Sequence, residues 1–263
     1  MNTISVVIPI HTINNELKKF FTNAVTSVAQ QIVQAEELLI VASKDEALNA
    51  FLNSYEFGSL KSITKVVVNP GETDFASQLN YAATQVSTTH MCILEVDDEL
   101  SKIWLKNVKT YMEAYPLQKA FLPIIVDTNA NGEFIDLSNQ PVWAAEFSQE
   151  MGIVDFDTLL AYQNFNTDGL VIDVETYKEV GGLKPSLKLT FIYEFLLRMT
   201  HFDNRLMVIP RLGYKHMNQR PGSLFFTYKD QITPAEARFW MNTAKKEYHH
   251  KHDRKITYAP ETT

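Results

Sequence analysis

The stretch Met91-Cys92-Ile93-Leu94-Glu95-Val96-Asp97-Asp98-Glu99 places four carboxylates at the end of a short apolar run. The apolar part predicts a buried strand over residues 91–96. Alternation along a strand puts Glu95 and Asp97 on the same side of the chain. Carboxylates this close repel one another unless a cation neutralises them, and their oxygens are the ligands that Mg²⁺ and Mn²⁺ prefer. The stretch therefore indicates either a metal and diphosphate site at a strand end or a solvated acidic turn that caps the next helix.

Upstream of this stretch, apolar β-branched runs alternate with segments of helical periodicity. Strands are predicted at residues 4–10, 38–42 and 63–68, and helices at residues 15–31, 45–55 and 75–86. This alternation is typical of βαβ units, which build a parallel sheet flanked by helices. Such sheets bind ligands outside the carboxyl ends of their strands, which is where the four carboxylates are expected to lie.

Downstream of the stretch, the pattern changes to shorter elements and a predicted hairpin. Strands are predicted at residues 120–127, 134–137, 170–172 and 206–210, and helices at residues 104–115, 174–180, 191–200 and 233–251. The sequence shows neither a linker-like stretch nor an internal repeat. The predicted fold class is therefore α/β, a single domain with a mixed, mostly parallel sheet flanked by helices and with a C-terminal helical tail.

The composition of the chain excludes several classes of protein. Its 263 residues contain one cysteine, so a disulfide framework, a cysteine-rich zinc site and an iron–sulfur cluster are excluded. The N-terminus lacks a signal-peptide pattern and no run of 18 apolar residues occurs, so we expect a cytoplasmic protein. The sequence lacks the motif G-x-x-x-x-G-K-[ST] of P-loop NTPases, a G-x-G-x-x-G after the first strand as in dinucleotide-binding domains, and the G-x-S-x-G of α/β-hydrolases. These three classes are therefore unsupported.

Charge is distributed unevenly along the chain. The formal net charge is −7, from −11 over residues 1–212 (15 basic and 26 acidic side chains) and +4 over residues 213–263 (9 and 5). An acidic body argues against duplex nucleic acid as a partner. The basic tail would suit an anionic acceptor or peripheral contact with a membrane surface. We expect Phe239 and Trp240 to pack the tail helix onto the body, and the tail to be dispensable for folding.

A series of short motifs runs in order along residues 4–224. In the first half they are the segment Ile4-Ser5-Val6-Val7-Ile8-Pro9-Ile10-His11, the spaced set Ala24, Ser27 and Gln31, a second spaced set of Gly71, Phe75, Ala76 and Asn80, and the segment Cys92-Ile93-Leu94-Glu95-Val96-Asp97-Asp98. In the second half they are Val180-Gly181-Gly182-Leu183, Glu194-Phe195-Leu196-Leu197-Arg198, and the pair Lys215-His216 followed by Arg220-Pro221-Gly222-Ser223-Leu224. In order and spacing they resemble the family 2 glycosyltransferases with the GT-A fold. The acidic segment looks like the D-x-D element of that family.

The resemblance implies an inverting transferase that moves a sugar from a nucleotide diphosphate to an unidentified acceptor hydroxyl. It implies a divalent metal, Mn²⁺ or Mg²⁺, held by Glu95, Asp97 and His216. The residues that it implies for binding the nucleotide-sugar are Pro9, Ile10, His11, Ser43, Asp45, Asn80, Glu95, Val96 and Asp97. It divides the chain into a GT-A domain over residues 1–224, with a nucleotide-binding half (1–100) and an acceptor half (101–224), and a basic helical tail over residues 225–263.

Two departures from the family pattern concern the site. The second strand ends in Val41-Ala42-Ser43-Lys44-Asp45, where the family has V-D-D and uses an aspartate to contact the nucleotide base. Ala42 cannot make that hydrogen bond, so Ser43 or Asp45 would substitute for it. The acidic pair that supplies the family's general base falls on Phe191 and Ile192, and neither side chain can take a proton.

Three alternatives remain for the general base. Glu194 lies on the same predicted helix, although an ion pair with Arg198 at i, i+4 is the structural alternative. Asp168 precedes a predicted strand, although an aspartate before Gly169 is also an ordinary turn residue. The third alternative is a catalytically silent GT-A domain that acts as a binding or assembly module.

Overall fold

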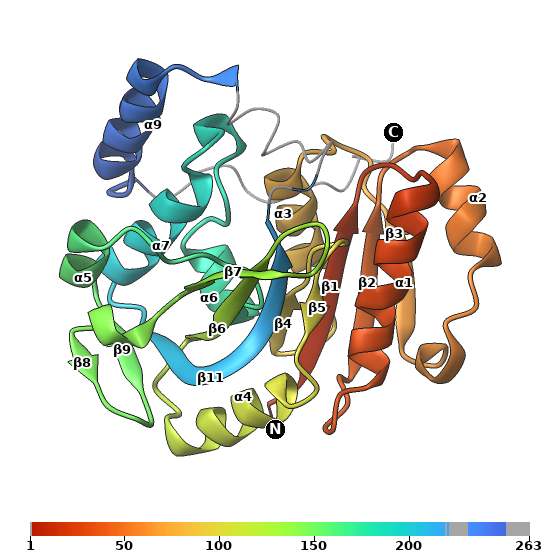
Figure 1. Ribbon diagram of the computed structural model, residues 1–263, viewed down its shortest axis with the longest axis horizontal. Coiled ribbons are helices and arrows are strands. Elements are labelled where there is room, and N and C mark those ends of the chain that lie inside the picture. Colours follow the sequence, from red (N-terminus) through yellow and green to blue (C-terminus); the bar gives the residue numbers. More distant parts are fainter. Residues whose placement is uncertain (1, 219, 221–230, 251–263) are drawn as a thin grey trace.

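One mixed sheet forms the centre of the computed structural model, which describes residues 2–218, 220 and 231–250 (Figure 1). Its strands lie in the order β3-β2-β1-β4-β10-β6-β11-β9-β8, with β5 paired to β11 and β7 paired to β6. In the central part, from β3 to β11, every strand except β10 runs in the same direction. This arrangement confirms the predicted α/β fold class.

The N-terminal half follows the predicted alternation closely. Its strands are β1 (Ile4–Ile10), β2 (Glu37–Ala42), β3 (Thr64–Val68) and β4 (His90–Ile93), joined by α1 (Asn15–Ala29), α2 (Glu46–Ser54) and α3 (Phe75–Gln85). Each of the three helices begins after a polar residue whose side chain accepts a hydrogen bond from the first turn, namely Asn14, Asp45 and Asp74. Strand β4 ends at Ile93, so the acidic residues lie in the loop that follows it.

The second half adds the strands that make the sheet mixed. These are β5 (Glu99–Leu100), β6 (Ala120–Thr128), β7 (Phe134–Ser138), β8 (Glu146–Phe147), β9 (Gly152–Val154), β10 (Val171–Asp173) and β11 (Leu206–Met217). Its helices are α4 (Trp104–Ala114), α5 (Phe156–Ala161), α6 (Val174–Glu179) and α7 (Phe191–His201). Strand β11 runs well beyond the predicted end at residue 210, with register irregularities against β6 between residues 208 and 214.

The two faces of the sheet are covered by separate apolar cores. One core joins the sheet to α1, α2 and α4, and the other joins it to α3, α5, α6 and α7. Strands β1 and β2 are buried along their whole length because helices lie on both faces. The carboxyl ends of β1, β4, β6 and β11 point to one edge of the sheet, and β10 begins at that edge because it is antiparallel.

The tail helix α9 (Pro234–Glu247) packs against α7. Its buried residue is Ala244, whereas Phe239 is 60% exposed, so the predicted anchoring by Phe239 is wrong. The Thr190 hydroxyl donates to the carbonyl of Trp240 at 3.0 Å, and Lys184 donates to that of Glu247 at 2.8 Å. The boundary between residues 224 and 225 lies outside the described residues.

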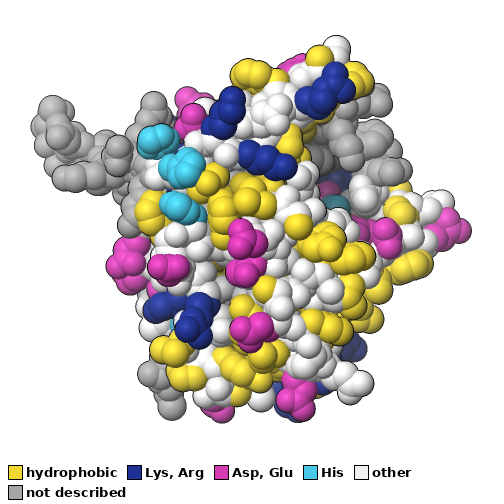
Figure 2. Space-filling model, turned by 90° about the vertical axis from the view of Figure 1, so that its left-hand side faces the viewer, with side chains coloured by type: hydrophobic (Ala, Val, Ile, Leu, Met, Phe, Trp, Pro, Cys, Tyr) yellow, Lys and Arg dark blue, Asp and Glu magenta, His cyan; other side chains and the backbone are white. Residues whose placement is uncertain are grey.

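The side of the molecule that carries α9 and α5 is chemically mixed. Figure 2 shows basic and histidine side chains interspersed there with acidic and apolar ones. Among the described residues, no helix is long and apolar enough to cross a membrane.

Candidate functional site

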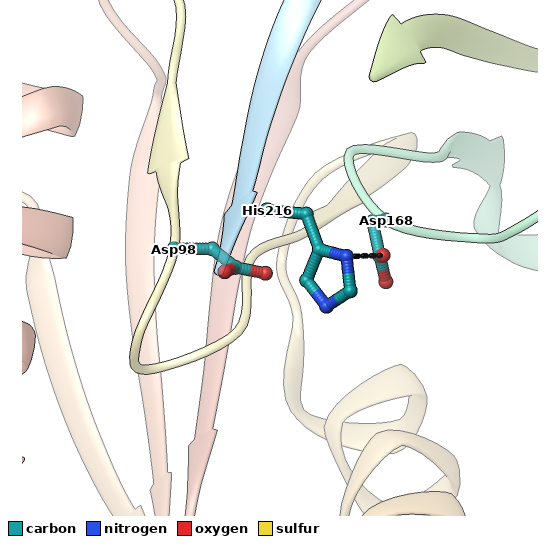
Figure 3. Close-up of side chains that lie close together, drawn as sticks. All are labelled: Asp98, Asp168 and His216. Carbon is teal, nitrogen blue, oxygen red and sulfur yellow. Dashed lines mark ion pairs between the residues drawn. The ribbon is translucent and has the colours of Figure 1, made fainter. Parts of the chain in front are cut away.

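Three titratable side chains meet at the carboxyl edge of the sheet. Asp98 follows β4, Asp168 precedes β10, and His216 lies near the end of β11 (Figure 3). One potential ligand atom of each lies within 4.8 Å of the others, and within the described part of the chain this is the one such group. Glu95 and Asp97 lie beside it in the same loop. The structure thus brings His216 together with Asp98 and Asp168 rather than with the expected pair Glu95 and Asp97.

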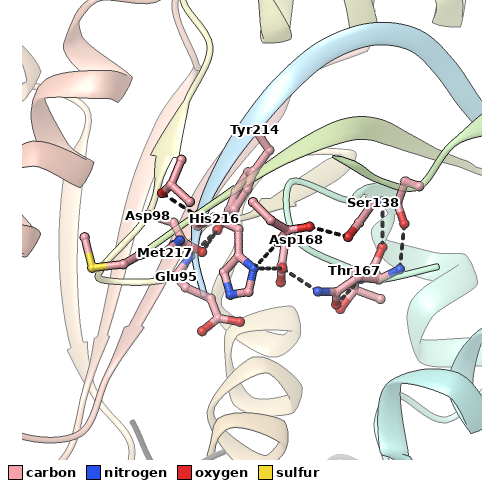
Figure 4. A network of polar contacts seen from close by, with 12 residues as sticks. Glu95, Asp98, Ser138, Thr167, Asp168, Tyr214, His216 and Met217 are labelled. Atoms are coloured by element: carbon pink, nitrogen blue, oxygen red, sulfur yellow. Dashed lines mark hydrogen bonds and ion pairs between the residues drawn. The ribbon is translucent and has the colours of Figure 1, made fainter. Parts of the chain in front are cut away.

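Tyr214 holds the acidic loop against β11. Its hydroxyl donates to Asp98 Oδ2 at 2.8 Å and accepts a hydrogen bond from the backbone N–H of Glu95 at 3.0 Å (Figure 4). The backbone N–H of Met217 donates to Asp98 Oδ1, also at 2.8 Å. Both oxygens of this buried carboxylate are therefore fixed by one strand, which gives Asp98 a defined position.

Gly169 lets the Asp168 loop approach β11 closely. Its φ of +72° is in the left-handed region, and a Cβ would lie 2.8 Å from Tyr214 Cδ2 and 2.9 Å from Pro123 Cγ. Trp104 donates from Nε1 to the Gly169 carbonyl at 3.0 Å. A side chain at position 169 would push Asp168 away from His216, so glycine is required here for both conformation and space.

A second carboxylate, which sequence analysis did not single out, contacts His216. Asp127 ends the predicted strand 120–127 and is the register partner of His216 in the parallel pair β6–β11. Its Oδ1 lies 2.8 Å from His216 Nδ1, and its Oδ2 accepts a hydrogen bond from the Ser138 hydroxyl at 2.5 Å. Asp168 Oδ2 is farther from the same ring nitrogen, at 4.0 Å. No local motif marks Asp127, because its contact depends on strand register across 89 residues of chain.

The buried carboxylates and His216 change one another's pKa values. Burial raises the pKa of Glu95 well above its usual value and that of Asp98 to about 8, and it also raises the pKa of Asp168. Burial lowers the pKa of His216, but its hydrogen bond to Asp127 and the nearby carboxylates outweigh burial and raise that pKa to about 11. The cluster therefore holds protons at neutral pH that a bound cation would displace.

Asp97 is engaged by a cation from the chain itself. Arg220 donates from Nε to Asp97 Oδ2 at 2.5 Å, and its guanidinium lies over the Phe20 ring. The pKa of His11 is lowered, first by burial and then by Arg220. The motif residues 221–224 lie outside the described residues.

The other predicted nucleotide-binding residues are divided between two places. Pro9 and Ile10 end β1, and His11 follows it and lies next to Ser43, whose hydroxyl donates to the His11 carbonyl at 2.6 Å. Asp45 accepts from the backbone N–H of Leu48 at 2.6 Å as the cap of α2. These residues border the carboxyl edge of the sheet, and part of their hydrogen-bonding capacity is used within the chain.

Asn80 does not lie with them. Its Oδ1 accepts from the Leu183 backbone N–H and from the Tyr177 hydroxyl, and its Nδ2 donates to the Leu183 carbonyl, at 2.7–2.8 Å. The side chain is buried. Asn80 therefore ties α3 to the turn at Gly181 and Gly182, and the expectation that it binds the donor is corrected.

Glu194 is also a structural residue. It is fully buried on α7, and Arg198 donates to both of its oxygens at 2.8–2.9 Å. Lys184 forms a second ion pair with Glu194 at 2.9 Å. Because both carboxylate oxygens are bound by buried cations, the structure contradicts the expectation that Glu194 acts as a base and shows the alternative i, i+4 ion pair.

The positions of the family's acidic pair remain apolar in the structure. Phe191 and Ile192 begin α7, and the Phe191 ring packs at 6.2 Å from that of Phe75. Trp104 is fully buried and cannot stack on a sugar, whereas Trp143 is 42% exposed and stacks on Tyr162. Among the predicted base candidates, Asp168 is the one that lies in the acidic cluster.

Comparison with known proteins identifies a family and a fold. The model of glycosyl transferase family 2 matches residues 5–166. A comparison with curated proteins finds no match.

Solved structures of TarS from S. aureus share the fold. The 1–349 fragment in complex with UDP-GlcNAc aligns with a TM-score of 0.66 at 18% identity, covering 97% of this chain and 69% of that chain. The same fragment in complex with UDP gives 0.62 at 15% identity, covering 97% and 68%. A longer TarS chain gives 0.61 at 15%, covering 97% of this chain but 41% of that one. This likeness confirms the predicted GT-A fold.

Proposed function

The chain belongs to glycosyl transferase family 2, and on that premise we propose that it transfers a sugar from a nucleoside diphosphate to an acceptor hydroxyl, with inversion and with the help of a divalent cation. The observation that carries the proposal is the cluster of Asp98, Asp168 and His216 at the carboxyl edge of the sheet. Ligands of such sheets bind at that edge.

A uridine nucleotide is the first donor to consider. The TarS structures of the same fold contain UDP and UDP-GlcNAc. In this chain Pro9, Ile10 and His11, at the end of β1, and Ser43 and Asp45, after β2, border the same edge and are proposed to hold the nucleotide. Ala42 stands where the family has an aspartate that contacts the nucleotide base, so binding measurements with different nucleotides identify the base that this chain prefers.

The residues of the cluster fit a hard divalent cation. Two carboxylates and an imidazole that is oriented by another carboxylate form a donor set that suits Mn²⁺ or Mg²⁺. We assign Asp98 and His216 as ligands, with Glu95 and Asp97 as flanking carboxylates within the same loop. Asp168 lies within reach of the same cation but is assigned to the acceptor proton. When bound, such a cation would neutralise the diphosphate and stabilise the leaving group as its charge builds.

The acceptor hydroxyl needs a group to take its proton, and Asp168 is the proposed base. In an inverting displacement the acceptor oxygen attacks the anomeric carbon while the bond to the diphosphate breaks, and the acceptor proton passes to the base. Burial raises the pKa of Asp168, which favours proton uptake. The neighbouring Thr167 hydroxyl is buried without a partner among the described residues, as expected for a group whose partner is a bound molecule. Cation binding and base catalysis by Asp168 compete, so the two roles are separable by experiment.

A binding or assembly module without transferase activity is the second candidate function. Two observations favour it. The family's acidic pair is replaced by Phe191 and Ile192, and Glu194 is engaged in ion pairs. Such a module would retain the nucleotide site and lose the factor of about 10²–10⁴ in rate that a positioned base supplies.

Titration calorimetry with UDP, in the presence and absence of Mn²⁺, tests the proposed function. We expect wild type to bind UDP more tightly with Mn²⁺, and Asp98→Asn to lose this increment. Asp136→Asn is the matched control, because Asp136 is an exposed aspartate on β7. Equal Mn²⁺ dependence in wild type and Asp98→Asn would contradict the assignment. Binding without sugar transfer to any glycan, lipid or protein acceptor in a broad screen would favour the binding module.

A further inference from the structure

We propose that Asp127 is a positioning residue, which fixes the ring of His216 so that Nδ1 donates to a carboxylate and Nε2 faces the cation, which displaces the Nε2 proton when it binds. The inference rests on the proposed function, in which His216 is one of the ligands. It concerns a residue outside every motif of the family resemblance.

Strand register places Asp127 beside His216. The two residues are partners in the parallel pair β6–β11, and Asp127 Oδ1 lies 2.8 Å from His216 Nδ1. The Asp127 side chain is 7% exposed, whereas that of His216 is 25% exposed. The backbone of His216 is held by the same strand, because the Thr128 hydroxyl donates to its carbonyl at 3.2 Å. The ring thus rests on a fixed carboxylate and keeps one accessible side.

The orientation of Asp127 is itself fixed by the β7 hairpin. Ser138 donates from its hydroxyl to Asp127 Oδ2 at 2.5 Å, which leaves Oδ1 for the imidazole. Ser138 pairs with Ile125 across the hairpin, one register step beyond Leu137 and Val126. Three strands therefore contribute to one chain of contacts, from Ser138 to Asp127 to His216.

The chemistry of these groups decides which ring nitrogen holds the proton. An ionised carboxylate only accepts hydrogen bonds, so the nitrogen that faces Asp127 must donate. Asp168 cannot replace Asp127 in this role, because its Oδ2 lies 4.0 Å from Nδ1, beyond hydrogen-bond distance. A histidine ligand that donates its other N–H to a carboxylate has a fixed tautomer and ring orientation, and loss of such a partner typically weakens metal binding 10–100-fold.

An asparagine at position 127 would reverse the tautomer. Its amide NH₂ can donate to Nδ1, which leaves the proton on Nε2, where it blocks the ligand lone pair. The variant keeps nearly the same shape, so a change in cation affinity reports on the proton rather than on packing.

The test measures binding of Mn²⁺ alone by calorimetry and by electron paramagnetic resonance, on the full chain. We expect Asp127→Asn to weaken Mn²⁺ binding about 10–100-fold. Ser138→Ala, which keeps Asp127 but frees its orientation, should weaken it less. Asp136→Asn removes an exposed charge from the register partner of Asp127 and should leave binding unchanged. Cooperative thermal unfolding of each variant serves as the folding control.

The outcomes separate this inference from the proposed function. If His216→Ala loses Mn²⁺ binding while the folded Asp127→Asn binds as wild type does, the positioning role is wrong and the cation site stands. If wild type binds no Mn²⁺, the cation site and this inference both fail. Should Asp127→Asn not fold, ¹⁵N NMR of wild type loaded with Zn²⁺ decides: a proton on Nδ1 of His216 supports the inference, and a proton on Nε2 overturns it.

Discussion

Replacement of Glu194 by glutamine separates a structural from a catalytic carboxylate. Glu194 is fully buried and carries two cationic partners, Arg198 at 2.8 Å and Lys184 at 2.9 Å. The substitution keeps the shape of the side chain and removes its charge. Arg198 would retain its bonds to the carbonyls of Val180 and Gly182, but two buried cations would lose their shared anion.

The expected cost follows from the burial of these charges. Removing one partner of a buried ion pair typically costs about 3–5 kcal/mol, because the remaining charge is left without compensation. For a chain of this size, about 2–4 °C of Tm corresponds to each kcal/mol, so Tm should fall by about 6–20 °C. Glu175→Gln is the matched control, since Glu175 forms an exposed ion pair with Lys178 at 3.0 Å. That change should cost less than about 1 kcal/mol.

Urea denaturation and a donor-binding titration on both variants give the answer. We expect the large loss of stability in Glu194→Gln alone, with the affinity for the donor preserved wherever the protein is folded. The reasoning would be refuted by a Glu194→Gln protein that is as stable as Glu175→Gln but has lost sugar transfer. That result would make Glu194 the base.

Four further outcomes are expected. Mn²⁺ must displace a proton from Asp98, whose pKa is raised to about 8, and one from His216, whose pKa is raised to about 11. Mn²⁺ affinity should therefore rise between pH 6 and 8, about tenfold per pH unit for each proton released. Calorimetry in two buffers measures the number of protons released, and an affinity that does not change with pH would contradict the prediction. The raised pKa of Asp98 also means that the folded chain without cation loses stability as pH rises toward 8, measurable by urea denaturation. Gly169→Ala should cost about 1–3 kcal/mol because of its φ of +72° and its clash with Tyr214. Gly132→Ala, at a similar φ of +79° but in open space, should cost less, and the difference reports the clash. Asp168→Asn should abolish transfer while preserving Mn²⁺ affinity if Asp168 is the base, and should lower Mn²⁺ affinity if it is a ligand.

Local sequence patterns were sufficient for most of the fold. The run Ile4–Ile10 is apolar and β-branched, and it forms a strand because helices cover both of its faces. Asn14 predicts the start of α1 through a local hydrogen bond, which depends on nothing distant. The end of β11 and the short strands β8 and β9 were not predicted, because they pair through register with distant segments rather than through their own composition.

The site was predicted only where one segment carries the signal. The acidic loop after β4 is visible in sequence because its four carboxylates lie within five residues. Asp127 and Tyr214 were missed, since each acts through a contact across many residues of chain. Glu194 was considered as a base because the family's acidic pair falls on Phe191 and Ile192; its alternative, the i, i+4 ion pair with Arg198, is present, and the distant Lys184 that completes the buried ion network was not predicted.

Anomalous diffraction from crystals grown with UDP and Mn²⁺ tests the central assignment most directly. The proposed function predicts a manganese peak at the carboxyl edge of the sheet, in contact with His216 Nε2 and with an oxygen of Asp98, with the diphosphate beside it. A peak bound elsewhere, or UDP bound at this edge in crystals without any manganese peak there, would contradict it.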